Sequence, residues 1–232
     1  MKQLENKPIY FIGDNHGQYD HMVSIVKSFD LRDCYLIHLG DGGEGFLPTD
    51  KQCRQFVYLN EFFSTRNVHY MSIRGNHSDP FYFQGESRIV HSNFELIEDY
   101  TVMEYNGKTI QFVGGAVSID RAARTEGISY WIDEAFVLDE NKAQKVDILI
   151  THTAPSWCYP QQVNSFVLEW ARGDEYLLDD LVVERQYVDR LFEICQPTLH
   201  LYGHFHASWS EFVKGCKHKL LNCNEVWEYR SE

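Results

Sequence analysis

Five short segments of the sequence place Asp, Asn or His directly after a run of apolar residues. They are Gly13-Asp14-Asn15-His16-Gly17, Gly40-Asp41-Gly42-Gly43, Gly75-Asn76-His77, Thr151-His152-Thr153 and Gly203-His204-Phe205-His206. Carboxylate oxygens suit hard divalent cations and imidazole nitrogens suit Mn, Fe, Zn or Ni, so these side chains can bind metal ions together. A buried polar cluster without partners is costly, and a pair of divalent cations removes that cost. The segments contain no cysteine, which argues against a structural zinc site of the Cys type.

Each segment follows a stretch that is typical of a buried β-strand. These stretches are short, rich in Ile, Val, Tyr and Phe, and end at Gly or at polar residues. They predict strands at residues 9–13, 35–40, 69–75, 109–116, 146–151 and 198–203. Ligands of open α/β sheets bind beyond the carboxyl ends of the strands. The five segments are therefore predicted to converge on one edge of a sheet.

Helical patterns lie between the predicted strands. Apolar residues recur at i, i+3, i+4 and i+7 around residues 19–29 and 177–192, and residues 49–64 show similar spacing;. The alternation of strands and helices is typical of an α/β sheet. Near the end of the chain, residues 208–214 and 219–223 predict an antiparallel hairpin with a turn at 214–217;. No repeat or linker divides the chain, so residues 1–232 are interpreted as one domain;.

The composition is that of a soluble globular protein. The 232 residues are 44% hydrophobic and 24% charged, and Lys plus Arg (21) against Asp plus Glu (34) gives a net charge of −13;. Such an acidic chain is a poor candidate for binding a long nucleic acid or an anionic membrane. No apolar stretch is long enough for a signal peptide or a membrane span. We therefore expect a cytoplasmic protein, whose oligomeric state the sequence does not predict.

The remaining histidines and cysteines are interpreted as structural. Six cysteines are spread along the chain without CxxC spacing, which favours reduced, buried thiols over a disulfide framework;. Cys158 has no His–Asp arrangement of its own in the sequence, so a thiol nucleophile is not expected. His200 is a single histidine in a predicted strand and His218 stands directly before another, and such residues are more often satisfied core side chains than ligands.

The order of the motifs Asp14-x-His16, Gly40-Asp41, Gly75-Asn76-His77, His152 and Gly203-His204-x-His206 resembles the calcineurin-like metallophosphoesterase superfamily. The motifs run from residue 13 to residue 206, so the resemblance covers nearly the whole chain. It implies an α/β fold that is a four-layer αββα sandwich. In this fold two mixed β-sheets are flanked by helices, and the metal ions lie at the carboxyl ends of strands.

The resemblance also implies the ligands of two divalent ions, for which we expect Mn, with Fe, Zn or Ni as alternatives. The expected ligands are Asp14, His16 and His206 for the first ion, Asn76, His152 and His204 for the second, and Asp41 as a bridge. Two ions about 3.5–4 Å apart can hold a bridging hydroxide that attacks phosphorus.

Five further residues receive expected roles at such a site. His77 is the candidate general acid or electrostatic stabiliser of the leaving oxygen, and it matches the family position. Glu44 stands three residues after Asp41, where the phosphoprotein-phosphatase branch has an acid that fixes this histidine. Arg74, Arg121 and Arg124 are candidate contacts to substrate phosphate. Alternatively, Arg121 and Arg124 pair with nearby acids in a surface loop.

The expected activity is hydrolysis of a nucleotide or another small phosphodiester or monoester. A serine/threonine-type phosphoprotein phosphatase is an alternative, weakened because Gly45 stands where that branch has a phosphate-gripping Arg. A nuclease is a second alternative, since the Gly-His-x-His ending belongs to the phosphodiesterase and nuclease-like branches. Outside enzymes, the alternative is a non-catalytic scaffold of the same fold, disfavoured because every expected ligand and His77 are present.

Overall fold

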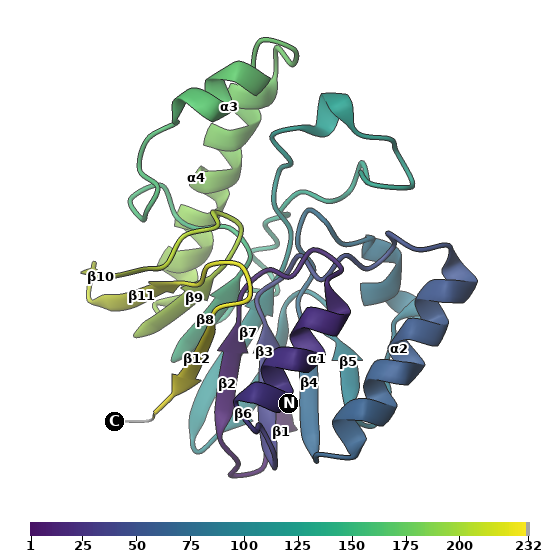
Figure 1. Cartoon of the computed structure of the whole chain (residues 1–232). Coiled ribbons are helices and arrows are strands. Elements are labelled where there is room, and N and C mark those ends of the chain that lie inside the picture. The colour runs from purple at the N-terminus through teal and green to yellow at the C-terminus, as the bar shows by residue number, and fades with distance from the viewer. Residues whose placement is uncertain (231–232) are drawn as a thin grey trace.

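A computed structural model describes residues 1–230 as two β-sheets packed face to face between helices (Figure 1). The larger sheet has seven strands, in the order β1 (Lys2–Gln3), β6 (Thr101–Tyr105), β7 (Lys108–Val113), β8 (Ile148–Thr151), β9 (Leu199–Tyr202), β11 (Cys216–Leu220) and β10 (Trp209–Val213). The smaller sheet has five, in the order β12 (Val226–Tyr229), β2 (Ile9–Ile12), β3 (Cys34–His38), β4 (Val68–Ser72) and β5 (Phe94–Leu96).

Both sheets are mixed. The pairs β6–β7, β10–β11 and β12–β2 are antiparallel, and the other pairs are parallel. In β2, Ile9 and Phe11 point toward the larger sheet and pack with Phe112 and Ile150, whereas Ile12 faces the opposite side. Because the central strands are buried on both faces, they appear in the sequence as continuous apolar runs rather than alternating ones.

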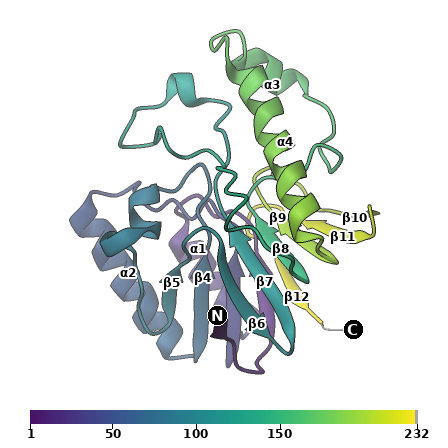
Figure 2. The same cartoon turned by 180° about the vertical axis from the view of Figure 1, so that it is seen from behind.

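Helices cover the outer face of each sheet. Their bounds are α1 (Tyr19–Ser28), α2 (Thr49–Ser64), α3 (Ser165–Trp170) and α4 (Leu177–Cys195), and single 3-10 turns occur at Pro80–Phe83, Gly85–Ser87 and Arg121–Ala123. Met22 of α1 and Phe56 of α2 pack on the smaller sheet, and Leu191 of α4 packs on Leu149 of the larger one. Figure 2 shows α4 lying across the larger sheet from behind. The expected αββα sandwich is confirmed.

The predicted helices and strands agree with the structure, and two expectations need correction. The terminal hairpin exists, but β11 begins at Cys216, inside the predicted turn. The turn is only Lys214 and Gly215, with φ of 49° and 76°, the left-handed pair that matches the twist of a two-residue hairpin;. The five polar segments also end strands of two facing sheets, not of one sheet. Among residues 1–230, no helix is both long and apolar enough to cross a membrane.

Candidate metal centre

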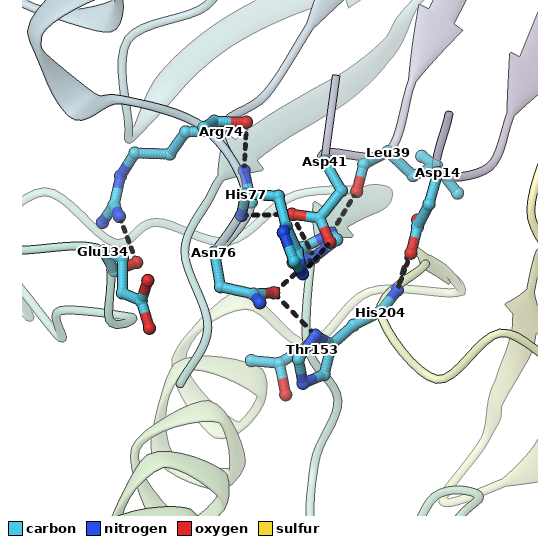
Figure 3. A network of polar contacts seen from close by, with 12 residues as sticks. Asp14, Leu39, Asp41, Arg74, Asn76, His77, Glu134, Thr153 and His204 are labelled. Atoms are coloured by element: carbon cyan, nitrogen blue, oxygen red, sulfur yellow. Dashed lines mark hydrogen bonds and ion pairs between the residues drawn. The ribbon is translucent and has the colours of Figure 1, made fainter. Parts of the chain in front are cut away.

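Loops from both sheets bring the expected ligands together at one end of the sandwich. Asp14 and His16 follow β2, Asp41 follows β3, and Asn76 and His77 follow β4, all in the smaller sheet. The larger sheet contributes His152 after β8 and both His204 and His206 after β9. Figure 3 shows side chains from these loops pointing at a common region.

The backbone of this region is constrained by close approach. Asp41 has a φ of 60° and His204 a φ of 69°, in the left-handed region that Asp and His tolerate better than most other side chains;. A β-carbon added to Gly75 would overlap the carboxylate of Asp41, and one added to Gly203 would overlap Asp14. The glycines before the ligands are therefore required because side chains of neighbouring loops occupy the space beside them.

The first group of ligands consists of Asp14, His16, Asp41 and His206. One donor atom of each lies within 4.8 Å of the others. The two Nε2 atoms of His16 and His206 are 2.9 Å apart, and His206 Nε2 is 3.4 Å from Asp14 Oδ2. Atoms of this kind at these separations can bind one ion in common.

The second group consists of Asp41, Asn76, His152 and His204. His152 Nε2 is 3.2 Å from Asp41 Oδ1 and 3.2 Å from Asn76 Oδ1, and His204 Nδ1 is 2.9 Å from Asn76 Oδ1. Asp41 therefore belongs to both groups, as expected for a bridging ligand.

Hydrogen bonds outside the second group fix which atoms face its centre. His152 donates from Nδ1 to the carbonyl of Leu39 at 2.7 Å, so its Nε2 faces the centre. Asn76 donates from Nδ2 to Ser118 Oγ at 2.9 Å, so its Oδ1 faces His152. One nitrogen and two oxygens thus point at one another, and once His152 loses its Nε2 proton a cation can bind between them. The residues present fit a pair of divalent ions.

Electrostatics of the protein without ions support the same interpretation. Burial opposes the ionisation of Asp41, but the charge of His152 outweighs it and holds the pKa of Asp41 well below its usual value. Burial also opposes the protonation of His152, but Asp41 raises the pKa of His152 to about 9. A hydrogen bond to Asp14 raises the pKa of His206 to about 10, whereas burial lowers the pKa of His204 to about 3. Protons on imidazoles balance the buried carboxylates here, and metal ions would replace them.

His77 lies at the rim of the centre. Its backbone N–H donates to Asp41 Oδ1 at 2.7 Å, and its Nε2 is 3.9 Å from Asp41 Oδ2. The ring lies against the guanidinium of Arg124, whose terminal nitrogens are 2.7 and 2.8 Å from Nδ1 and Nε2. Burial, opposed by Asp41 and aided by Arg124, lowers the pKa of His77 to about 4. The imidazole is neutral at pH 7 in this environment.

Glu44 supports the loop that carries His77 rather than the ring itself. The carboxylate is fully buried and accepts a hydrogen bond from Ser78 Oγ at 2.7 Å. Ser78 Oγ in turn accepts from the backbone of Gly75 at 3.2 Å. No hydrogen bond joins Glu44 to His77 within the described residues 1–230. Burial raises the pKa of Glu44 to about 7.

Two of the three candidate arginines pair with groups outside the metal centre. Arg74 donates to Asp99 Oδ2 at 2.8 Å and to the carbonyls of Glu134 and Ala135 at 2.6 and 3.0 Å. Arg121 pairs with Asp174 and Asp180, the carboxylates of a distant loop and of α4. The alternative of pairing with acids applies to Arg124, which pairs with its neighbour Asp120, and to Arg121, which pairs with acids far away in the sequence. The expectation that Arg74 and Arg121 bind substrate is not supported.

Arg124 does reach the centre. Its Nε pairs with Asp120 Oδ1 at 2.7 Å, and its terminal nitrogens face His77. It also borders an open hollow of about 480 Å³ above the ligands, lined by His16, Phe46, His77, Arg124, Ser129 and His206. A substrate phosphate that entered this hollow would meet the guanidinium.

Cys223 also lies at this centre, although nothing in the sequence predicted a role for it. One donor atom each of Cys223, His16 and His206 lie within 4.8 Å of one another, and hydrogen bonds to the two imidazoles lower the pKa of the Cys223 thiol to about 7. The prediction placed Cys223 in a strand, whereas it lies in the loop after β11. The expectation of a centre without sulfur therefore holds for the five motifs but not for the whole site. No periodicity or motif marks Cys223.

Comparisons with known proteins identify the family. The family model of the calcineurin-like phosphoesterases matches residues 7–208. A comparison with curated proteins gives no match. Phosphopantetheinyl hydrolase from Mycobacterium tuberculosis has a similar structure at 12% identity, with 95% of this chain and 91% of that chain covered and a TM-score of 0.49.

Two further solved structures are similar at comparable identities. A putative 5'-nucleotidase from Staphylococcus aureus is 11% identical, with 97% of this chain and 50% of that chain covered and a TM-score of 0.47. A protein serine/threonine phosphatase from Saccharomyces cerevisiae is 13% identical, with 96% and 70% covered and a TM-score of 0.36. None of these likenesses bears on the substrate. The family match spans most of the sequence and includes all the motifs at the strand ends, so the chain belongs to the calcineurin-like phosphoesterase family and is a metal-dependent hydrolase of phosphoric esters.

Proposed function

We propose that this enzyme hydrolyses a small phosphoester, a nucleotide or a related diester or monoester, at two divalent ions, preferably Mn²⁺. The seven expected residues are proposed as the ligands, with Asp41 shared. The observation that carries the proposal is the set of metal-binding groups around Asp41, next to an open hollow that His16, His206 and Arg124 line. The net charge and the dispersed cysteines support a cytoplasmic location as part of the same proposal.

The side chains around the two ions would have separate roles in the reaction. When bound, the two ions activate a water molecule and neutralise charge on the phosphate. Asp41 is held in place by the backbone N–H of His77, and Asn76 is held by Ser118. Arg124 would orient a non-bridging phosphate oxygen. His77, beside it at the floor of the hollow, would stabilise the leaving oxygen with a hydrogen bond.

Aromatic side chains at the rim favour a substrate with a flat group. Phe46 lines the hollow and stacks on Trp131, with ring centroids 6.2 Å apart and an interplanar angle of 14°. Stacking on such a ring suits every nucleobase because each presents a π-face. This feature supports a nucleotide over a phosphorylated side chain.

The geometry at Gly45 disfavours the phosphoprotein-phosphatase alternative. Gly45 has a φ of 101°, and an added β-carbon would lie 2.6 Å from the Cβ of Asp79 and 2.7 Å from Trp131. An arginine at this position would be strained in backbone and in space. This loop therefore does not accommodate an arginine at the position where that branch has one.

The decisive experiment is hydrolysis by the full chain after metal removal and reconstitution with Mn²⁺. Bis-p-nitrophenyl phosphate and p-nitrophenyl phosphate separate diester from monoester preference, and nucleotides, cyclic nucleotides, dinucleotides, phosphopeptides and short DNA then narrow the substrate. We expect hydrolysis of at least one nitrophenyl ester and a preference for nucleotides over phosphopeptides. A protein that binds two ions per chain but hydrolyses none of these compounds would instead be a scaffold.

A further inference from the structure

A second cluster of metal-binding side chains lies outside the catalytic centre. Cys158, His200 and His218 each place one donor atom within 4.8 Å of the others, and all three residues are completely buried. His218 Nδ1 is 3.1 Å from His200 Nδ1 and 3.2 Å from Cys158 Sγ. The sequence analysis interpreted all three as structural and did not connect them.

The topology of the larger sheet explains why they meet. His200 on β9 and His218 on β11 are direct partners in the register of two parallel strands, so their side chains leave the sheet on the same face;. Cys158 reaches them from the loop after β8. Arg185 of α4 holds that loop by donating to the carbonyls of Pro160 at 2.5 Å and Cys158 at 2.7 Å. The cluster is therefore preorganised by three elements.

Hydrogen bonds fix the tautomer of His200. Its Nε2 lies 2.7 Å from Thr151 Oγ1, and the hydroxyl of Thr151 donates its own hydrogen to the carbonyl of Thr153. Thr151 Oγ1 therefore accepts from His200, the ring proton is on Nε2, and Nδ1 presents a lone pair to His218.

Neither tautomer of His218 then satisfies the cluster. Its Nε2 is buried and has no hydrogen-bond partner within residues 1–230. With the ring proton on Nδ1, Nε2 is a buried acceptor that lacks a donor. With the proton on Nε2, the two Nδ1 lone pairs face one another, and the thiol hydrogen of Cys158 can satisfy only one of them. A cation between these three atoms removes this conflict of lone pairs.

We propose that Cys158, His200 and His218 form a separate structural site for one thiophilic metal ion of the Zn²⁺ or Cu⁺ class. A tetrahedral Zn²⁺ with bonds of about 2.0–2.1 Å to nitrogen and about 2.3 Å to sulfur separates two nitrogens by about 3.3 Å and a nitrogen from sulfur by about 3.6 Å. The distances of 3.1 and 3.2 Å are only a few tenths shorter. Thiolate and imidazole donors select such ions over Mg²⁺ or Mn²⁺.

Binding would change the protonation of one atom. The S–H bond of Cys158 breaks, its electron pair forms the bond to the ion, and the proton is released to solvent. The ion would join the loop after β8 to β9 and β11. Phe192 of α4, whose ring stacks on His218 at 5.5 Å, separates the cluster from a surface hollow of about 380 Å³ that offers a route of entry.

Cobalt substitution tests the site without altering it. The probe is Co²⁺ added in excess to the full chain carrying Cys223→Ser, which removes the sulfur beside His16 and His206. We expect a near-ultraviolet thiolate-to-cobalt charge-transfer band corresponding to about one Co²⁺ per chain. The proposal is overturned if the folded Cys223→Ser protein shows no such band. Because the catalytic ligands then contain no sulfur, this result is independent of whether the enzyme hydrolyses phosphoesters.

A second variant tests whether Cys158 is the thiolate that produces the charge-transfer band. Adding Cys158→Ser is expected to remove the band and about one metal equivalent, while hydrolysis relative to the Cys223→Ser parent persists. Adding Cys34→Ser, a buried thiol in the other sheet, is the matched control and should retain the band. A band that survives Cys158→Ser contradicts the proposal. Stoichiometric Zn²⁺ or Cu⁺ should displace the band, and the ion that does so at the lower concentration is the preferred one. Persistence of the band against both ions contradicts the assigned class.

Discussion

Ser118 is predicted to control the affinity of the second catalytic ion without touching that ion. Its Oγ accepts from Asn76 Nδ2 at 2.9 Å, and its backbone N–H donates to Glu134 Oε1 at 2.7 Å. Because the amide NH₂ of Asn76 can only donate, Oγ faces Asn76 as an acceptor. This fixes Asn76 Oδ1 toward His152 and the shared centre.

In Ser118→Ala the amide of Asn76 loses this partner and is free to rotate in the metal-free protein. The rotated Nδ2 could donate to His204 Nδ1, which now lies 2.9 Å from Oδ1 and belongs to a neutral imidazole. Binding of the second ion must reverse the rotation and leave a buried donor unpaired, which costs about 1–3 kcal/mol. Since 1.4 kcal/mol is a tenfold change in an equilibrium constant, the second ion should bind about 10- to 100-fold more weakly.

The assay is calorimetric titration of metal-free protein with Mn²⁺, which resolves two binding steps. In Ser118→Ala we expect the dissociation constant of the weaker step to increase about 10- to 100-fold and that of the tighter step to stay unchanged. Hydrolysis should recover at high Mn²⁺ concentration. Ser72→Ala is the matched control, since Ser72 is equally buried and pairs with His38 rather than with a proposed ligand. A folded Ser118→Ala protein with the wild-type affinity for both ions, or with both affinities reduced equally, would refute the reasoning.

Four further outcomes are expected. His77→Ala should keep both metal ions in elemental analysis and lose rate, most of all with poor leaving groups; loss of the ions would contradict its placement. Arg124→Ala should raise KM for phosphoesters about tenfold with metal content unchanged, whereas an exposed control, Arg172→Ala, should leave KM alone. Gly45→Ala should lower the free energy of unfolding by about 1–3 kcal/mol in urea titrations, because alanine is strained at the positive φ of this position and its β-carbon would overlap Trp131;. Chelation should abolish hydrolysis, and Mn²⁺ should restore it; activity that survives exhaustive chelation would exclude a metal-dependent mechanism.

The parts of the fold that the sequence predicted are those with strong periodicity. The helix at residues 49–64 agrees in both bounds with α2, and the runs after which the motifs stand agree with β2, β3, β4, β8 and β9. The strands that were missed are short or lie at edges, with the exception of β6, a five-residue strand inside the larger sheet. Val226–Tyr229, for example, is half-exposed on every residue, so no alternation marks it, and only its pairing with β2 makes it a strand.

The division of the strands between two sheets could not be predicted from periodicity. A central strand of either sheet is buried on both faces, so β3 and β8 have the same apolar character in the sequence;. The partner of each strand depends on long-range packing between the two inner faces. The convergence of the motifs was nevertheless predicted correctly, because both sheets present the carboxyl ends of their parallel strands at the same end of the sandwich.

Side-chain partners were the least predictable, since they depend on register and on loops rather than on spacing. Arg74 stands directly before the Gly-Asn-His motif, yet its guanidinium turns away to Asp99, and Arg121 finds its acids more than fifty positions later in the chain. The same limit hides the buried cluster. His200 and His218 are unremarkable when each is considered alone, and only the parallel register of β9 and β11 makes them neighbours. A histidine in a buried strand can therefore be interpreted only after its cross-strand partner is known, because that partner decides whether the imidazole lone pair meets a donor or another lone pair.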